Sequence, residues 1–351
     1  MIDRVENNGI GLLDPLHDPD WDERVRAHEN ASFFMTSSWA RVLADSYGYH
    51  PRYFGEVRNG DLTALMPFME VSSILTGKRG VSLPFTDQCE PIASNVAGLQ
   101  DVLRSAVDHG KRTGWKYLEL RPGSGLDARM PPSTVCFGHV LDLTPGPDQL
   151  FRGLRDSTRR NIKRAQHAGV TVTVSDAADD LLEFCRLNCM TRREHGLPPQ
   201  PAKFFGNIQR HVLARGHGMV VLASYGGNTI AGAVYFHFGR NAVYKYGASD
   251  RRYQNLRANN LVMWEAIRRY ASDNLRLFDF GRTEPGNEGL LQFKRGWGAV
   301  EGPVNYYRYD LRRGEFVTSR LAVAGAHTTY FRHMPMPLLK LTGTLLYRHM
   351  G

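Results

Sequence analysis

The chain has 351 residues, of which 42% are hydrophobic, enough to form sizeable buried cores and to argue against disorder away from the ends. This length predicts two domains rather than one. The net charge of +9 favours polyanionic partners such as RNA, nucleotide phosphates or an anionic membrane, although a solvated basic face would account for it equally well.

The first residues are polar, and no apolar run reaches the roughly 18 residues of a membrane span, so we expect a cytoplasmic protein without a signal peptide. The four cysteines show no C-x-x-C spacing. Cys185 and Cys189 lie four residues apart on an apolar helical pattern, which is typical of buried thiols. The histidines form no H-E-x-x-H or similar cluster, and we therefore expect no metal site.

The first half of the chain has the pattern of an α/β domain. Between two strand patterns, the turn Arg58-Asn59-Gly60-Asp61 predicts a β-hairpin. The predicted elements are helices near Trp21 and over residues 33–48, strands over 53–57 and 62–71, a helix over 99–112 and a strand over 116–121.

The second half repeats this order of elements around the turn Tyr225-Gly226-Gly227-Asn228. Two related α/β halves are the economical interpretation, and a coincidental order of elements is the alternative. The predicted elements are strands over residues 219–224 and 229–238, a strand from Val243, a helix over 260–272 and a strand over 276–281.

A proline-rich stretch, residues 130–148, separates the halves, and a basic helix over residues 150–169 follows it. Ser157 or Thr158 can cap this helix, and Gly169 can end it. The helix has six cations and one aspartate, and these cations can bind phosphates. In the alternative interpretation, its apolar residues pack inward and the cations only face water. The candidate phosphate contacts are Arg159, Arg160 and Lys163.

Residues 243–299 form a strand, a polar loop, a helix, a strand and then a glycine-rich loop. Units of this kind place ligands at the mouth formed by their loops, so we expect the functional site here. The tail over residues 320–351 mixes apolar and basic side chains. It either lies on an anionic membrane or packs on the first domain.

Three segments, DFGRTEPGNEGLLQFKRGWGA, NNLVMWEAI and LRDSTRRNIKRAQHAG, resemble the FemAB family, and more narrowly its members associated with exosortase and exopolysaccharide systems. The resemblance covers nearly the whole chain. It implies an α/β (α+β) fold of two tandem GNAT-like halves, each a mixed twisted sheet flanked by helices. The expected domains are residues 1–145, residues 146–319 with the main site, and a helical tail over 320–351.

The resemblance also implies transfer of an acyl or aminoacyl group to an amine of a peptidoglycan peptide or an exopolysaccharide sugar. The acceptor would be a nucleotide- or lipid-linked envelope precursor, with peripheral contact to the inner membrane. Aminoacyl-tRNA or acyl-CoA would be a co-substrate, without a bound cofactor. The long helical arm of some relatives is missing from this sequence, which weakens the case for tRNA.

The acyl-CoA alternative can be compared with the Q/R-x-x-G-x-G/A loop of GNAT enzymes, whose glycines let backbone N–H groups approach the pyrophosphate. Gln254 matches that pattern, while Arg257 and Asn259 stand at the two small positions. We interpret this as evidence against tight CoA binding. The identity of the donor therefore stays open.

Direct attack of the amine on the donor in a ternary complex needs a group that stabilises the oxyanion, a group that binds a substrate carboxylate or phosphate (the clamp), and a base. Lys294 is the expected stabiliser and Arg282 the expected clamp. Asp279 orients Arg282 or acts as a weak base, and Glu288 is a second possible base. The expected substrate contacts are Tyr246, Arg257, Asn259 and Asn260, the two asparagines also capping the helix.

Each of these residues also has an ordinary structural interpretation. A non-catalytic GNAT-fold protein that organises envelope or exopolysaccharide synthesis is therefore the competing hypothesis.

Overall fold

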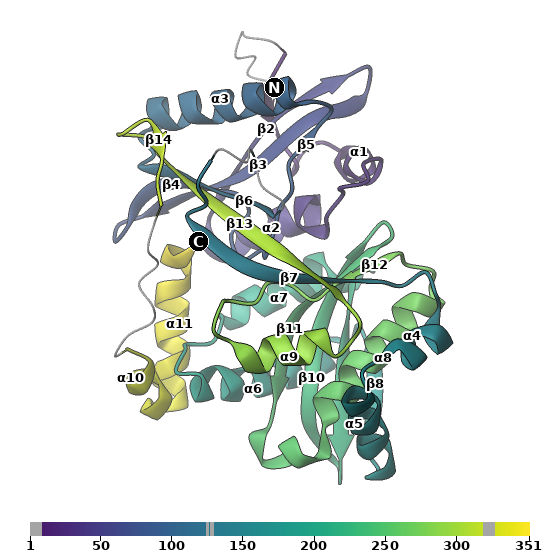
Figure 1. Ribbon diagram of the computed structural model, residues 1–351. Coiled ribbons are helices and arrows are strands. Elements are labelled where there is room, and N and C mark those ends of the chain that lie inside the picture. Colours follow the sequence, from purple (N-terminus) through teal and green to yellow (C-terminus); the bar gives the residue numbers. More distant parts are fainter. Residues whose placement is uncertain (1–8, 124–125, 127–129, 319–326) are drawn as a thin grey trace. The chain divides into compact units, whose positions relative to one another are not determined.

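The structure is a computed structural model that describes residues 9–123, 126, 130–318 and 327–351 (Figure 1). The chain forms two compact units. Unit 1 consists of Met1–Cys136, Pro303–Leu321 and Leu346–Gly351, and unit 2 of Phe137–Gly302 and Ala322–Leu345.

The first boundary lies at residue 136 rather than at 145, because the strand that begins at Thr134 pairs with a strand of unit 2. The second expected boundary, at 319/320, lies outside the described residues. From residue 327 onward the tail is helical.

Unit 1 is a mixed sheet with the strand order β1-β2-β3-β4-β6-β13, in which β4 and β6 are parallel. Its strands are β1 (Gly11–Leu13), β2 (His50–Arg58), β3 (Asp61–Ser73), β4 (Gly77–Val81), β5 (Ile92–Ala93), β6 (Tyr117–Gly123), β13 (Val300–Asp310) and β14 (Glu315–Phe316). Its helices are α1 (Trp21–Arg26), η1 (Phe33–Met35), α2 (Ser37–Tyr47) and α3 (Val96–Thr113).

Unit 2 is a mixed sheet with the strand order β7-β12-β11-β10-β9-β8, in which β11 and β12 are parallel. Its strands are β7 (Thr134–Asp142), β8 (Thr171–Ser175), β9 (Gly218–Tyr225), β10 (Asn228–Phe238), β11 (Asn241–Ser249) and β12 (Leu277–Asp279). Its helices are α4 (Pro147–Gly153), α5 (Asp156–His167), α6 (Ala178–Glu194), α7 (Ala202–His211), η2 (Leu213–Arg215), η3 (Arg251–Leu256), α8 (Ala258–Ser272) and α9 (Glu288–Arg295). Helices α10 (His327–His333) and α11 (Met336–Met350) complete the chain.

Both units contain a hairpin with the same tight turn. Asn59 and Gly60 between β2 and β3 have φ angles of 54° and 93°, and Gly226 and Gly227 between β9 and β10 have 55° and 76°. Two successive left-handed residues make the turn that suits the twist of a hairpin, which explains the asparagine and glycines at these positions. Both predicted hairpins are confirmed, and so is the repeated order of elements.

Helices cover both faces of the unit 2 sheet. Ala231, Ala233 and Tyr235 of β10 belong to the same buried cluster as the inner face of α8. The intervening Gly232 faces the other way, where a Cβ would contact Phe184 of α6. Alternate residues of one strand therefore contact opposite helical layers, as the period of two requires.

One part of the expected glycine-rich loop after β12 is a helix. Asn287 accepts a hydrogen bond from the backbone of Leu290 through its side chain and so caps α9. Leu291 and Lys294 are buried on one face of this helix. The prediction of a continuous loop was wrong because the glycines around this segment masked a short amphipathic helix of eight residues.

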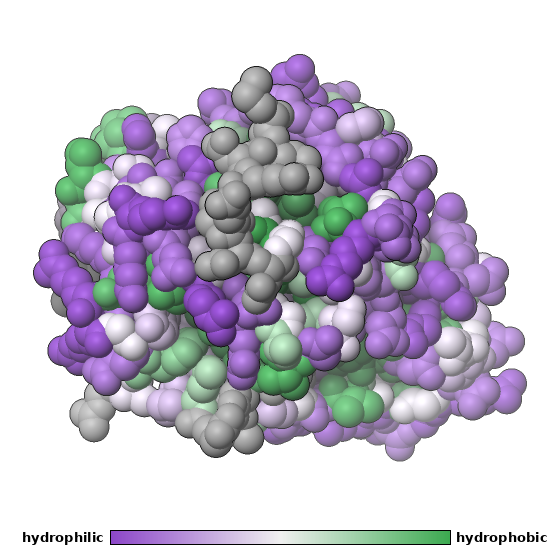
Figure 2. Space-filling view, turned by 90° about the horizontal axis from the view of Figure 1, so that it is seen from above, coloured by the Kyte–Doolittle hydropathy of each residue, from purple (hydrophilic) through white to green (hydrophobic). Residues whose placement is uncertain are grey.

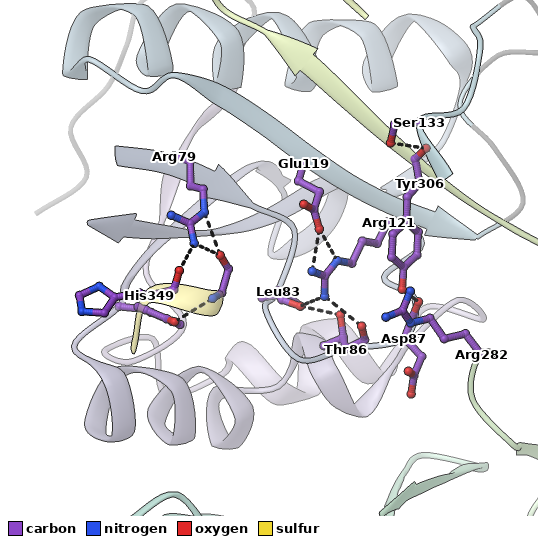
Figure 3. Close-up of polar contacts among 12 residues, drawn as sticks. Arg79, Leu83, Thr86, Asp87, Glu119, Arg121, Ser133, Arg282, Tyr306 and His349 are labelled. Atoms are coloured by element: carbon purple, nitrogen blue, oxygen red, sulfur yellow. Dashed lines mark hydrogen bonds and ion pairs between the residues drawn. The ribbon is translucent and has the colours of Figure 1, made fainter. Parts of the chain in front are cut away.

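In unit 1, Arg121 of β6 supports the loop that follows β4 (Figure 3). Its guanidinium donates to Glu119 and, over 3.0 Å, to a backbone carbonyl of that loop, and it lies 5.3 Å from the ring centre of Tyr306. Leu83 and Phe85 in the loop have φ angles of 51° and 62°, which are unfavourable for residues with a side chain. These contacts hold the loop in a strained conformation.

The face drawn in Figure 2 is mostly hydrophilic, and its hydrophobic residues form separate small patches. Such a surface is ordinary for a folded domain. Among the described residues, none of the helices has both the length and the apolar character needed to cross a membrane.

Candidate active site

Strand β11 has an open edge in unit 2. It pairs with β10 from Asn241 to Ser249, whereas its parallel pairing with β12 covers only Asn241 to Val243 in the described chain. The two parallel strands therefore separate after Val243. A separation between parallel strands leaves backbone groups of β11 facing a gap that a ligand can enter.

A β-bulge at Lys245 changes which side chains face this gap. Tyr235 of β10 pairs with Tyr244, but its neighbour Val234 pairs with Tyr246, so Lys245 is the extra residue. Tyr244 consequently packs beside Tyr235, with ring centres 5.6 Å apart. Tyr246 instead lies 5.7 Å from the ring of Phe205 on α7.

A cavity of about 450 Å³ lies at the open edge, within the range of small-molecule sites. Its walls come from β10, β11, the loop over residues 250–257, and the first parts of α8 and α9. Tyr246 does not line this cavity, and its expected substrate contact is not supported there. The polar residues that line it include Thr191, His195, Tyr235, Tyr244, Ser249, Asp250, Arg257, Asn259 and Asn260.

Of the two tyrosines in the cavity wall, Tyr235 is fully buried and Tyr244 is partly buried. Burial raises the pKa of Tyr244 to about 12 and raises that of Tyr235 well above its usual value. Both hydroxyls therefore stay protonated at neutral pH and can donate hydrogen bonds. The sequence pointed to Tyr246 rather than Tyr244 because strict alternation cannot reveal a bulge.

Thr191 of α6 marks the far end of the open edge. Its hydroxyl donates to the carbonyl of Ser249 over 3.2 Å and accepts from the N–H of Ser249 over 3.1 Å. The next residue, Asp250, donates its N–H to the carbonyl of Ile230 in β10, so the backbone groups of Ser249 point away from β10. By alternation, those of Gly247 point to the same open side.

The loop before α8 is held by Asp250, which is 4% exposed. Its carboxylate accepts from the N–H of Arg252 over 3.0 Å and from the guanidinium of Arg252 over 2.6 Å. These hydrogen bonds lower the pKa of Asp250. The carboxylate thus acts as a fixed support beside the cavity.

Helix α8 begins earlier than expected, and its N-cap is Arg257, which has a φ of 61° and makes no side-chain capping bond. The prediction that Asn259 and Asn260 cap the helix was wrong, because both lie in its first turn. All three nevertheless line the cavity, together with Gln254. The left-handed backbone at Arg257 is the conformation for which glycine is usual, so this loop retains a glycine-like turn.

Lys294 does not line the cavity. It is 2% exposed, and its Nζ donates to the carbonyl of Gly281 over 2.7 Å and to that of Arg282 over 3.1 Å. Its expected role beside an oxyanion stays a prediction. In this geometry Lys294 holds the turn that follows β12.

The other three expected catalytic residues also lie outside the cavity lining. Asp279 accepts the N–H of Gly281 over 2.7 Å, so it supports the same turn as Lys294. Arg282 Nη2 lies 3.6 Å from Glu284 Oε1. Glu288 is exposed in the first turn of α9.

In the basic helix α5, the apolar residues pack inward and most of the cations face water, as in the second interpretation of its sequence. Ile162 and Ala165 are fully buried in the cluster that contains α8. Arg160 and Lys163 are exposed, and Arg159 bonds to Asp156 on the same helix. The expected cap at position 157 or 158 was wrong, since α5 begins at position 156 without a side-chain cap. Phosphate binding by the exposed cations stays a prediction.

Residues 152–295 match the family model of the acetyltransferase (GNAT) domain. This segment contains the cavity walls of β10, β11, α8 and α9. No match to a curated protein was found.

Three solved structures have the same fold over most of the chain. The structure of FemX superposes with a TM-score of 0.68 at 14% identity, covering 87% of this chain and 98% of that one. The C-terminal domain of a putative lysylphosphatidylglycerol synthetase from Agrobacterium fabrum superposes with a TM-score of 0.55 at 12% identity, covering 82% of this chain and 89% of that one. A tandem GNAT protein from the clavulanic acid biosynthesis pathway superposes with a TM-score of 0.51 at 9% identity, covering 86% of this chain and 98% of that one. The fold is thus a mixed α/β fold of the tandem GNAT type, as expected.

Proposed function

We propose that the protein is an acyltransferase that transfers an acyl or aminoacyl group to an amine, with the acyl end of the donor in the unit 2 cavity. The observation that carries this proposal is the cavity at the open edge of β11, inside the segment that matches the acetyltransferase (GNAT) model. An amide or ester of the donor can pair with the backbone groups of Gly247 as a short extra strand would.

The reaction fits direct attack. The amine nitrogen attacks the donor carbonyl carbon, the bond from that carbon to the leaving oxygen or sulfur breaks with its electron pair on the leaving atom, and the proton lost by the amine ends on that atom. The phenol of Tyr244 and the N–H of Gly247 are the donors that we assign to the developing oxyanion. His195 accepts the amine proton in this proposal, because Asp250, another ionisable residue of the lining, is engaged by Arg252.

The residues that lie outside the cavity lining have supporting roles in this proposal. Lys294 and Asp279 fix the turn at Gly281, and through it they position Arg282 as a clamp for a substrate carboxylate or phosphate. Glu288 at the start of α9 contributes negative charge at the rim. These are positioning roles rather than contacts with the reacting atoms.

For the donor, we favour aminoacyl-tRNA over acyl-CoA, and for the acceptor a cell-envelope precursor. The FemAB resemblance supports this choice, as does the similarity in fold to a putative lysylphosphatidylglycerol synthetase. The exposed cations of α5 supply a surface for RNA phosphates. Arg257, where GNAT loops carry glycine, narrows the approach of a CoA pyrophosphate.

The direct test is to incubate the full chain with aminoacyl-tRNA and, separately, with acyl-CoA, each with an amine acceptor, and to measure consumption of the donor. We expect turnover with aminoacyl-tRNA, and a drop of roughly 10²-fold in the Tyr244→Phe variant, since one oxyanion donor is lost. Turnover with acyl-CoA alone would reverse the choice of donor. If neither donor is consumed above the rate without protein, the acyltransferase proposal is wrong and a binding role replaces it.

A further inference from the structure

Helix α11 presents two apolar faces. On one face, Leu339 is fully buried, and Gly343 lies so close to the backbone of Pro199 that a Cβ would collide with it. This face anchors the helix to unit 2. On the other face, three leucines are 54% to 59% exposed. They are Leu338, Leu341 and Leu345, which we call the leucine stripe.

The spacing of three and four residues places the leucine stripe in one row along the helix. Tyr330 on the preceding helix α10 is 70% exposed as well. Single exposed apolar residues are normal, but a row of them on a helix that already has a buried apolar face calls for a partner.

The charge of this region identifies the class of partner. Residues 327–351 contain no aspartate or glutamate, whereas Arg332, Lys340 and Arg348 are exposed. Arg348 follows the last leucine of the stripe by three residues, so it borders the stripe on the helix surface. A row of leucines bordered by Arg348, in a segment without any acidic residue, matches an anionic lipid surface. A second copy of the chain would bring like charges together instead.

The polar groups of α11 are already satisfied within the helix. The hydroxyl of Thr342 donates to the carbonyl of Leu338 over 2.9 Å, and that of Thr344 donates to the carbonyl of Lys340 over 3.0 Å. Hydroxyls that bond back to their own helix lower the cost of leaving water. The helix has 15 residues and is about 22 Å long, shorter than the roughly 30 Å hydrocarbon core.

We propose that the leucine stripe of α11 docks the protein on the surface of an anionic lipid bilayer, with the helix lying in the plane of the interface. The leucines enter the acyl boundary, and Arg348 contacts the lipid phosphates. This docking is independent of the proposed transferase activity, since it requires neither donor nor acceptor.

The test is flotation of the full chain with vesicles of phosphatidylcholine alone and with vesicles of phosphatidylcholine and phosphatidylglycerol in equal amounts. We expect binding to the anionic vesicles, weakened by salt, and little binding to the neutral ones. The triple variant Leu338→Ser, Leu341→Ser, Leu345→Ser should lose at least about tenfold in vesicle affinity. The variant Arg348→Gln should lose about fivefold in vesicle affinity.

The matched control is Leu182→Ser. Leu182 is 67% exposed and lies on α6, near the opposite end of that helix from Glu194, whose carbonyl accepts from Arg332. This control should bind vesicles as the unchanged protein does, and all variants should unfold at the same temperature, because the substituted side chains face water.

Three results would overturn the proposal. One is equal binding to neutral and anionic vesicles, or no binding to either. Another is a dimer in sedimentation without lipid that the triple serine variant converts to a monomer, which would assign the stripe to contact between two copies. Equal vesicle binding by the triple variant and the unchanged protein would also reject the stripe as the docking surface.

Discussion

The hydroxyl of Tyr244 occupies the space where a side chain at position 247 would begin. A Cβ built on Gly247 would come within 3.0 Å of that oxygen, closer than real Cβ atoms approach other atoms. The absence of a side chain at Gly247 therefore lets the phenol lie across the strand, next to the backbone groups that face the open edge. Gly247 and Tyr244 together thus place a phenol hydroxyl beside the backbone groups in the cavity wall.

The Gly247→Ala variant tests this relationship. The added methyl group displaces the Tyr244 ring from its site against Tyr235, so we expect turnover to fall by roughly 10²-fold, the usual effect of a lost oxyanion donor. Measuring kcat and the unfolding midpoint together separates a site effect from global unfolding. Gly206→Ala is the control, because a Cβ there meets nothing within 4 Å, and it should keep full activity.

The assignment of His195 as proton acceptor predicts that His195→Gln lowers kcat by about 10² to 10⁴-fold while changing KM little. The side chain is exposed at the end of α6, so its replacement should leave the free energy of unfolding within about 0.5 kcal/mol of the unchanged value. Steady-state kinetics with saturating acceptor gives both constants. Unchanged kcat would remove His195 from the mechanism.

Lys294→Met should destabilise unit 2. The variant leaves the carbonyls of Gly281 and Arg282 without their buried donor, at a cost of at least about 2 kcal/mol. Urea unfolding measures this difference. The exposed Lys163 on α5 serves as the comparison, since Lys163→Met should change the free energy of unfolding by less than about 0.5 kcal/mol. Equal effects of the two substitutions would contradict the positioning role of Lys294.

The stability of the protein should fall as the pH drops below about 6.5. His139 is fully buried, and burial lowers its pKa, with a further decrease from the nearby Lys294 ammonium. The folded state then binds the proton less readily than the unfolded state. Stability is therefore complete above the ordinary histidine pKa and declines as the pH falls towards the lowered one.

The measurement is the free energy of unfolding at about pH 7.5 and about pH 5.5. His139→Gln should flatten the decline, because it removes the buried group with the lowered pKa. A decline that His139→Gln leaves unchanged would assign the effect to other histidines.

If α5 contacts RNA, the triple variant Arg160→Gln, Lys163→Gln, Arg164→Gln should weaken binding of tRNA and lower the slope of log affinity against log salt by about 2 to 3. All three side chains are exposed, and the fold should persist. Fluorescence anisotropy with labelled tRNA over a series of salt concentrations gives the slope. A slope that does not change would show that the cations of α5 only face solvent.

The sequence predicted the parts of the fold that local rules determine. Both hairpins followed from the Asn-Gly and Gly-Gly turns, and α8 followed from its apolar spacing, because these signals act within a few residues. Three of the expected substrate contacts, Arg257 and the two asparagines after it, line the cavity.

Other parts depended on contacts that no local pattern contains. The bulge at Lys245 exchanged the roles of Tyr244 and Tyr246, and it arises from pairing with β10 rather than from composition. Lys294 does not line the cavity because it lies on the buried face of α9. This helix could not be predicted because glycines surround it in the sequence. Thr191 and His195 reach the cavity from α6, more than 50 residues before Ser249 in the chain.

Unit 1 is built from three separate segments of the chain, and this affects the order in which the two units can fold. Strand β6 has β13 as its neighbour, and residues 305–310 of β13 supply that pairing. A ribosome therefore completes nearly all of the central segment of unit 2 before the last strand of unit 1 emerges. Until then the edge of β6 has no such partner on the nascent chain, and such edges recruit foreign strands. Synthesis thus favours unit 2 as the first unit to reach its native state, while unit 1 depends on protection of β6.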